Sequence, residues 1–329
     1  MVLLREILNL FPPVMQKALE EAVDWKTVHE IRVRVGQPLE VVYYKDYEWL
    51  EHLVPTETEK NHILNQVSQF SLYRLEDELR EGFITVEGGH RIGLAGKVNT
   101  SNGAVQAIRY ISSFNIRIAR EKRGAAQGLM GRLVHKGNYC NTLIIGAPQT
   151  GKTTLLRDIT CHISTGWKGV AAKKVAVIDE RSEIGASIHG VPQLNLGRRT
   201  DIMDACPKSE GMMMMIRSMS PDVLVVDEIG HQRDVDAIQE AINAGVTLYC
   251  TVHGNNLKEL RKRPSIKQLL DQQVFKRFVL LQKSGSGNPA GRAMILDETE
   301  NIMDVTSGGN AHEVDRSPVI TSRHHMGRI

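Results

Sequence analysis

The sequence has no long hydrophobic run, few aromatic residues and almost no net charge. Each apolar stretch in its 329 residues is soon broken by a charged residue or by glycine. None approaches the roughly 18 consecutive apolar residues of a membrane-spanning helix, so no such helix is expected. Aromatic residues make up 5% of the chain, and the formal net charge is +3. These values do not indicate a concentrated basic face with interleaved aromatics, so no nucleic-acid partner is expected.

Cysteine is also scarce, and its four copies are Cys140, Cys161, Cys206 and Cys250. They lie far apart and form neither a C-x-x-C pair nor a zinc-ligand cluster with nearby histidines, so we expect reduced, mostly buried thiols. Near the N-terminus, Arg5 and Glu6 interrupt the apolar stretch, which favours an amphipathic helix over a secretory signal. Export is therefore not expected, and a cytoplasmic location is.

The remaining composition is typical of a folded globular protein. Hydrophobic residues make up 41% and charged residues 24%, unlike the apolar-poor, highly charged profile of disorder. A length of 329 residues favours about two domains. We predict an N-terminal α+β domain over residues 1–123, an α/β domain over residues 124–308, and a polar, flexible tail over residues 309–329.

The first predicted domain combines helical and strand patterns. Apolar spacing indicates two helices within residues 3–22, separated by two prolines, and a further helix over residues 62–82 that ends at a glycine. Residues 31–44 alternate apolar and polar side chains around a Gly-Gln-Pro turn, which predicts a hairpin. Further strands are indicated at residues 83–89, 90–98 and 114–120.

The second predicted domain alternates helices with short, purely apolar strands. The four strand segments are residues 142–147, 174–180, 222–228 and 246–253. Such alternation predicts a parallel sheet with helices on both faces. Residues 275–281 and 293–298 flank a Gly- and Ser-rich segment, and they predict a hairpin with a long loop.

Residues 146–153 read GAPQTGKT and fit the phosphate-binding pattern G-x-x-x-x-G-K-[ST]. The pattern follows a strand and precedes a helical segment, which is the context of a P-loop. Glycines let backbone N–H groups curl round phosphates, and the helix N-terminus adds a favourable dipole. The predicted nucleotide-binding residues are Gly146, Ala147, Pro148, Gln149, Thr150, Gly151, Lys152, Thr153 and Thr154. Among them, Lys152 is predicted to contact the β- and γ-phosphates of ATP and to act in catalysis, and Thr153 to bind Mg²⁺.

Polar residues follow three more of the predicted strands, at the sheet edge where ligands of parallel α/β sheets collect. Asp227 is predicted to hold Mg²⁺ through its water shell, and Glu228 to orient and deprotonate the attacking water. A helix-capping role is the alternative for this acidic pair. His253 is predicted to sense the γ-phosphate, although a core histidine bonded to backbone fits the same position. Glu180, next to Asp179, is predicted to be catalytic.

Two further features of the sequence point to contacts between subunits. Phosphoryl transfer commonly uses an arginine from a neighbouring subunit. The sequence does not choose among the candidates Arg91, Arg109, Arg117, Arg120, Arg198, Arg199 and Arg217. The run MMMMIRSM at residues 212–219 cannot direct its four consecutive methionines to one core, because successive helical residues step by about 100°. Either some of them meet an interface that changes with the nucleotide, or the helix is buried on nearly all sides.

The order of these motifs resembles that of the type II/IV secretion (traffic) ATPases. GAPQTGKT is followed by VAVIDER, then by IRSMSPDVLVVDEIG, and then by TLYCTVHG. The resemblance implies a RecA-like P-loop ATPase core. It places Asp179 and Glu180 in the aspartate box of that family, Glu228 at the end of its Walker B strand and His253 in its histidine box. Secretion ATPases usually carry glycine where this chain has Asp227, so either Asp227 or Glu228 is a candidate for organising Mg²⁺.

Phrases such as FNIRIAREKRG and DACPKSEGMMMMIRSMSPDV resemble more closely a sporulation branch of this superfamily in endospore-forming bacteria. That resemblance implies a homo-oligomeric, hexameric ring that hydrolyses ATP with Mg²⁺. It also implies docking on membrane proteins of a secretion-like channel, at the mother-cell face of the membrane around the forespore. Two other functions stay open. A RecA- or helicase-type motor would bind nucleic acid in a salt-dependent way, and a nucleotide-gated scaffold would bind ATP with little turnover.

Overall fold

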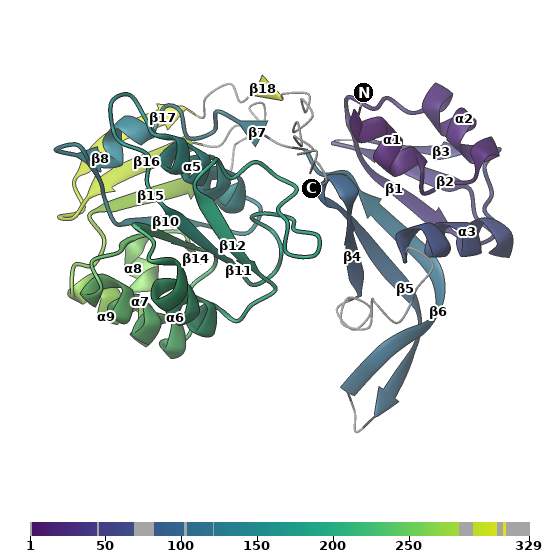
Figure 1. The fold of residues 1–329 in the computed structure, drawn as a ribbon. Coiled ribbons are helices and arrows are strands. Elements are labelled where there is room, and N and C mark those ends of the chain that lie inside the picture. The colour runs from purple at the N-terminus through teal and green to yellow at the C-terminus, as the bar shows by residue number, and fades with distance from the viewer. Residues whose placement is uncertain are drawn as a thin grey trace, which may run out of the picture. The chain divides into compact units, whose positions relative to one another are not determined.

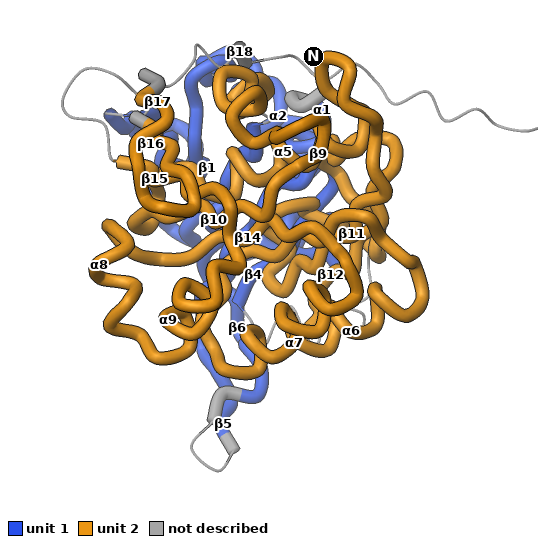
Figure 2. The backbone as a smooth tube through the Cα atoms, turned by 90° about the vertical axis from the view of Figure 1, so that its left-hand side faces the viewer, with its two compact units in different colours: residues 1–121, 314–329 blue, residues 122–313 orange. Residues whose placement is uncertain are grey.

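The computed structural model describes residues 2–44, 46–68, 82–101, 104–120, 122–282, 292–307 and 312–313. The chain forms two compact units, Met1–Glu121 and Lys122–Glu313, which Figure 2 draws in different colours. The division lies close to the boundary predicted at residue 123. Of the predicted tail, only β18 (His312–Glu313) is described, and it pairs with β7 (Lys122–Arg123). Among the described residues, no helix combines the length and the apolar character needed to span a membrane.

The first unit contains an antiparallel sheet packed against helices (Figure 1), with the strand order β3-β2-β1-β6-β5-β4. The strands are β1 (Val28–Arg34), β2 (Leu39–Tyr43), β3 (Tyr47–Leu50), β4 (Phe83–Val86), β5 (His90–Ser101) and β6 (Ala104–Arg117). The helices are α1 (Val2–Leu8), α2 (Pro13–Ala22) and α3 (Glu57–Val67). Ile7, Leu19 and Ile63 from these helices share a buried core with Ile31 and Ile116 from the sheet. The predicted α+β fold of this region is confirmed.

Helix α3 begins earlier than its apolar spacing predicts. The Thr56 hydroxyl accepts a hydrogen bond from the backbone N–H of Thr58, and the Glu59 carboxylate accepts one from the backbone N–H of Thr56. This capping box fixes the helix start ahead of residue 62, where the apolar pattern begins. The predicted continuation over residues 69–81 lies outside the described part of the chain. Gly82, the first described residue after this gap, has a left-handed φ of 78°.

The second unit contains an eight-stranded sheet with the order β12-β11-β13-β14-β10-β15-β16-β17. The strands are β10 (Thr142–Gly146), β11 (Val175–Asp179), β12 (Thr200–Asp204), β13 (Val223–Val226), β14 (Thr247–His253), β15 (Arg277–Gln282), β16 (Arg292–Asp297) and β17 (Ile302–Ser307). Pairing is parallel from β12 to β15 and antiparallel from β15 to β17. The predicted parallel sheet and its C-terminal hairpin are therefore confirmed. The sequence patterns do not indicate β12 and β17, because these edge strands are half-exposed and lack an apolar run.

Helices cover both faces of this sheet, as predicted (Figure 1). On one face, α5 (Lys152–Thr165) packs Leu156 and Ile159 into a core with Ile144, Val177 and Val225. The other face carries α6 (Lys208–Met219), α7 (Gln232–Asn243), α8 (Leu257–Leu260) and α9 (Pro264–Asp271). Alternate residues of the central strands are buried in the two cores on opposite faces of the sheet. Because both faces are buried, the sequence of these strands is almost continuously apolar. A short hairpin of β8 (Val134–His135) and β9 (Asn138–Tyr139) precedes β10.

The methionine run lies on α6 and is only partly buried. Met212 and Met215 are buried against the sheet, and Met213 packs at the edge of the same core. Met214 is 54% exposed, so burial on nearly all sides does not hold. A role of the exposed methionine in an interface stays a prediction. None of the four cysteines, all of which lie in the described residues, is in a disulfide.

Candidate functional site

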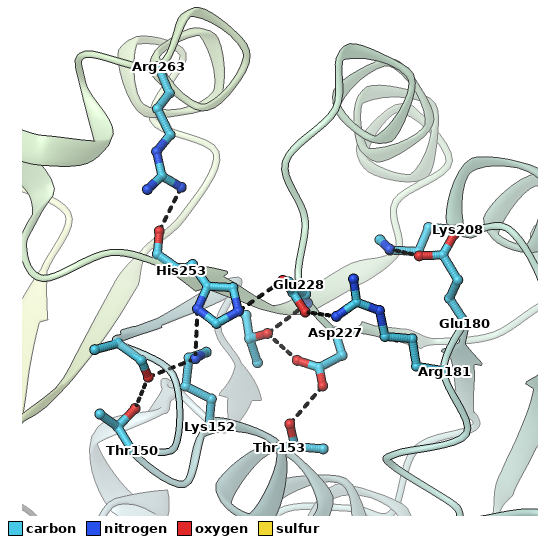
Figure 3. Close-up of polar contacts among 12 residues, drawn as sticks. Thr150, Lys152, Thr153, Glu180, Arg181, Lys208, Asp227, Glu228, His253 and Arg263 are labelled. Atoms are coloured by element: carbon cyan, nitrogen blue, oxygen red, sulfur yellow. Dashed lines mark hydrogen bonds and ion pairs between the residues drawn. The ribbon is translucent and has the colours of Figure 1, made fainter. Parts of the chain in front are cut away.

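The carboxyl ends of three neighbouring parallel strands meet at one edge of the second unit's sheet. Strands β13, β14 and β10 are adjacent in the sheet order. Gly146, the last residue of β10, is paired with His253, the last residue of β14. Asp227 and Glu228 directly follow β13, and Lys152 begins α5. The structure therefore brings the predicted P-loop lysine, both acidic residues and the histidine together, as Figure 3 shows.

The loop between β10 and α5 has the tight geometry that its glycines permit. A Cβ atom on Gly146 would lie 2.4 Å from Oγ1 of Thr150, so a larger residue there would require the Thr150 side chain to move. Gly151 has a left-handed φ of 87° immediately before α5. The Ala147 carbonyl oxygen accepts hydrogen bonds from Thr150 Oγ1 at 2.8 Å and from Lys152 Nζ at 3.0 Å. The lysine head group therefore lies within the curve of the loop.

Lys152 places a buried positive charge at this point. The residue is 7% exposed, and burial lowers the pKa of its ammonium group because the charged form loses hydration. The carboxylates of Asp227, Glu228 and Glu183 act in the opposite direction. Nζ lies 3.4 Å from Nδ1 of His253. A desolvated ammonium in this position suits an anionic ligand, which would replace the hydration that burial removes.

Asp227 is held between helix α5 and strand β14. Its Oδ2 accepts a hydrogen bond from Thr153 Oγ1 at 2.8 Å, and its Oδ1 accepts one from the Thr251 hydroxyl. Thr251 Oγ1 in turn accepts the backbone N–H of Glu228 at 2.7 Å. Thr251 is a contributor that the sequence analysis misses. Its one signal is a polar residue inside the otherwise apolar strand that leads to His253.

Glu228 has both carboxylate oxygens engaged. Oε1 lies 2.8 Å from Nε2 of His253, and Oε2 lies 2.8 Å from Nη1 of Arg181. A neutral imidazole with its proton on Nε2 satisfies both of its neighbours, because it accepts from Lys152 through Nδ1 and donates to Glu228. Arg181 is a second contributor, to which the sequence analysis assigns no role. It follows Glu180 just after the end of β11, where the sequence analysis predicts catalysis by Glu180.

Glu180 and Asp179 bond to groups other than the predicted site residues around Lys152. The Glu180 carboxylate pairs with Lys208 at the start of α6 and points away from Lys152 in Figure 3. Asp179 is buried and accepts the backbone N–H groups of residues 183, 184 and 185 at 2.8, 2.9 and 2.8 Å. These bonds give Asp179 a structural task, which is to fold the loop after β11. Catalysis by Glu180 stays a prediction.

The buried carboxyl of Asp179 gives a prediction about pH. Burial raises its pKa to about 6, whereas an aspartate in an unfolded chain has a pKa of about 3.9. The folded state therefore favours the protonated carboxyl, and this contribution to stability is lost as the pH rises through about 6. Between about pH 4 and pH 7, we expect the free energy of unfolding of the wild type, relative to Asp179→Asn, to fall by about 1–3 kcal/mol. Urea unfolding of both proteins across this range is the measurement, and a pH-independent difference would contradict it.

Two of the arginine candidates are bound to backbone within their own unit. Arg120 donates to the carbonyl oxygens of Trp25 and Val28 at 2.9 Å each, and Arg199 donates to that of Ala172 at 2.8 Å. The Arg109 side chain lies outside the described residues. An arginine supplied by a neighbouring subunit stays a prediction.

Comparisons with known proteins bear on the family and the fold. The family model described as "Sporulation stage III, protein AA" matches residues 4–302. Stage III sporulation protein AA of Bacillus subtilis (strain 168) is 45% identical over 307 residues, which cover 93% of this chain and 99% of that protein.

Two solved structures share the fold. The ATPase DotB of Legionella pneumophila aligns with a TM-score of 0.58 at 13% identity, over 88% of this chain and 82% of that one. The pilus retraction motor PilT, solved with bound ADP, aligns with a TM-score of 0.57 at 13% identity, over 89% and 83%. At this identity the likeness concerns the fold alone. It confirms the predicted RecA-like fold of the second unit, which follows a smaller N-terminal sheet domain in the chain.

Proposed function

Because this chain belongs to the family described as sporulation stage III, protein AA, and has the fold of the secretion ATPases, we propose that it hydrolyses ATP to drive a secretion-like channel between mother cell and forespore during endospore formation. Membership of a sporulation family supports a role in endospore formation. The fold supports a secretion-type motor, and the site supports ATP hydrolysis.

The observation that carries the proposal is a connected set of polar groups beside the P-loop. Thr153 bonds to Asp227 at 2.8 Å, Glu228 bonds to His253 at 2.8 Å, and His253 lies 3.4 Å from Lys152. The set comprises a hydroxyl, two carboxylates, an imidazole and an ammonium. Phosphoryl transfer depends on such groups because catalysis consists of positioning and charge stabilisation rather than covalent chemistry by the protein.

The residues present fit both ATP and Mg²⁺. The glycine-rich loop and the start of α5 offer backbone N–H groups to phosphates, and Lys152 adds a buried charge. Thr153 and Asp227 place two hard oxygen donors side by side. Among the described residues, no cluster of three or more His, Cys, Asp or Glu side chains could hold a metal by itself. That fits Mg²⁺, which takes its remaining ligands from phosphates and water and would neutralise charge on the β- and γ-phosphates.

The chain's own groups then divide the work of hydrolysis. Lys152 neutralises charge on the phosphates, and its burial strengthens that interaction. Glu228 orients the attacking water and accepts its proton. His253 holds one Glu228 oxygen and faces the P-loop lysine, so it senses the occupant of the loop through both. Asp227 and Thr153 provide the oxygen ligands of Mg²⁺, directly or through water.

The finer parts of the proposal concern assembly and place. We expect a homo-oligomeric, hexameric ring in which a neighbouring subunit's arginine completes each site. The ring would dock on membrane proteins of the channel, at the cytoplasmic, mother-cell face of the membrane around the forespore. The exposed Met214 on α6 offers an adaptable apolar contact for such assembly.

Removal of the Asp227 charge tests the Mg²⁺ site. In the Asp227→Asn variant we expect half-maximal ATP hydrolysis to require about tenfold more Mg²⁺, because a carboxylate that helps to hold the ion is lost. ATP binding without Mg²⁺ is expected to stay unchanged. Phosphate release at stepwise Mg²⁺ concentrations measures the first effect, and equilibrium dialysis with EDTA measures the second.

Several results would count against the proposal. A wild type that binds ATP without hydrolysing it would indicate a nucleotide-gated scaffold. Hydrolysis that depends on added DNA or RNA, with steep salt dependence of binding, would indicate a nucleic-acid motor. An unchanged Mg²⁺ requirement in Asp227→Asn would show that Asp227 does not hold the ion. A chain that stays monomeric at high concentration with ATP and Mg²⁺, measured by light scattering, would contradict the ring.

A further inference from the structure

Glu228 is held by side chains from the two strands on either side of its own. In the sheet, β13 lies between β11 and β14. Arg181, just after β11, contacts Glu228 Oε2 through Nη1 at 2.8 Å, and His253, at the end of β14, contacts Oε1 through Nε2 at 2.8 Å. Figure 3 shows the two donors approaching the carboxylate from opposite sides. The sheet order thus produces a two-sided clamp.

The backbone of Glu228 is fixed, but its side chain needs these contacts. The residue has a left-handed φ of 55°, and its N–H is bonded to Thr251 Oγ1 at 2.7 Å. Beyond the Cα atom, a glutamate has three rotatable bonds and samples several rotamers when nothing holds its carboxylate. A general base must keep an oxygen within hydrogen-bond reach of the attacking water. The orientation of the Glu228 carboxylate therefore depends on the groups that bond to its two oxygens.

Arg181 is well placed to supply that grip because its own loop is anchored on both sides. Asp179, two residues before it, accepts the backbone N–H groups of residues 183, 184 and 185, which follow it. After it, the Ser182 hydroxyl donates to Asp204 Oδ1 at 2.7 Å. The planar guanidinium also fixes a direction, which a flexible ammonium does not. The clamp thus connects a rigid loop to the predicted base.

Stability does not account for the pair. The Arg181 and Glu228 side chains are 62% and 33% exposed, and ion pairs this open to water contribute less than about 1 kcal/mol to folding. The bond that Arg181 forms is to Glu228 and not to a P-loop residue. This geometry indicates a role at the carboxylate and not in holding phosphate. What remains is control over where the Glu228 carboxylate lies.

We propose that Arg181 is a positioning residue for hydrolysis, which with His253 holds the Glu228 carboxylate in the orientation that receives the proton of the attacking water. The proposal rests on the ATPase function proposed above. Arg181 acts through Glu228 and leaves nucleotide binding to the P-loop. Its removal therefore slows turnover without weakening the affinity for ATP.

The test compares variants of the full chain in one ATPase assay. We expect Arg181→Gln to lower kcat roughly tenfold, because the base loses one of its two contacts. The Kd for ATP, measured by equilibrium dialysis, is expected to stay within about twofold of the wild type. Arg181→Lys keeps the positive charge but lacks the planar donor geometry of the guanidinium, and it should retain part of the rate that Arg181→Gln loses. Arg132→Gln is the matched control, because Arg132 forms a similarly exposed pair with Asp304, at 52% and 32%, away from the site.

A double variant separates positioning from any independent effect. If Arg181 works through Glu228, adding Arg181→Gln to Glu228→Gln lowers the rate no further than Glu228→Gln alone. A wild-type or increased kcat in Arg181→Gln would overturn the proposal, as would a further fall in the double variant or a parallel loss of ATP affinity. Absence of hydrolysis by the wild type itself would overturn the ATPase function, and this inference with it. That outcome is distinct because every variant is then equally inactive.

Discussion

Lys152→Ala is expected to weaken ATP binding by roughly 100-fold and to abolish hydrolysis at ordinary ATP concentrations, because a charge-assisted contact to phosphate contributes about 3 kcal/mol. The lysine head group lies inside the P-loop, 3.0 Å from the Ala147 carbonyl oxygen and 7% exposed. Isothermal titration with ATP and Mg²⁺ measures the affinity, and phosphate release measures the rate.

The folding of this variant is expected to survive. The Ala147 carbonyl oxygen keeps its hydrogen bond from Thr150, and removal of a desolvated ammonium relieves a cost of burial. Lys174→Ala, which removes an exposed lysine that donates to the Ser220 carbonyl oxygen, is the matched control and should bind ATP normally. Unchanged affinity in Lys152→Ala, with the fold intact by circular dichroism, would show that ATP does not bind at this loop.

Glu228→Gln is expected to slow hydrolysis at least about 100-fold while ATP still binds, since a general base contributes about 10²- to 10⁴-fold to a rate. The substitution keeps the size of the side chain and its contact with His253, but an amide does not accept the proton of water. Single-turnover hydrolysis and the Kd for ATP, measured on the same preparation, separate chemistry from binding.

This variant also decides between the two acidic residues that follow β13. If Asp227 were the base, Glu228→Gln would hydrolyse ATP near the wild-type rate, and Asp227→Asn would lose turnover at every Mg²⁺ concentration. Glu240→Gln, on the exposed surface of α7, controls for the loss of one carboxylate in this unit. Asp227 is bonded to Thr153, the predicted Mg²⁺ ligand, and this contact favours Asp227 for holding the ion and Glu228 as the base.

Local sequence patterns predict most of the fold. Mostly apolar segments predict β10, β11, β13 and β14, because a strand buried on both faces tolerates few polar side chains. The same reasoning fails for β12 and β17, which lie at the sheet edges with half-exposed side chains. It also places the start of α3 too late, because the capping box at Thr56 and Glu59 carries no apolar signal.

Within the site, a residue is predictable when its neighbours in the chain define its task. Gly146, Gly151 and Lys152 belong to one contiguous loop, and Asp227 and Glu228 directly follow a recognisable strand. The roles of Thr251 and Arg181 are not predictable in this way. Their partners lie 24 and 47 positions away in the chain, and the contacts exist only because β14 and β11 flank β13.

The sequence by itself determined that a glycine-rich loop with the phosphate-binding pattern lies between a buried strand and a helix, because that motif is local and its glycines meet a local backbone demand. It also determined which acidic residues and which histidine stand at strand ends. Only the tertiary structure decided what each side chain touches. The sheet order gave Glu228 a clamp from Arg181 and His253, gave Asp227 its two hydroxyl donors, and turned Glu180 towards Lys208. Pairings of this kind depend on strand adjacency, which no stretch of sequence encodes alone.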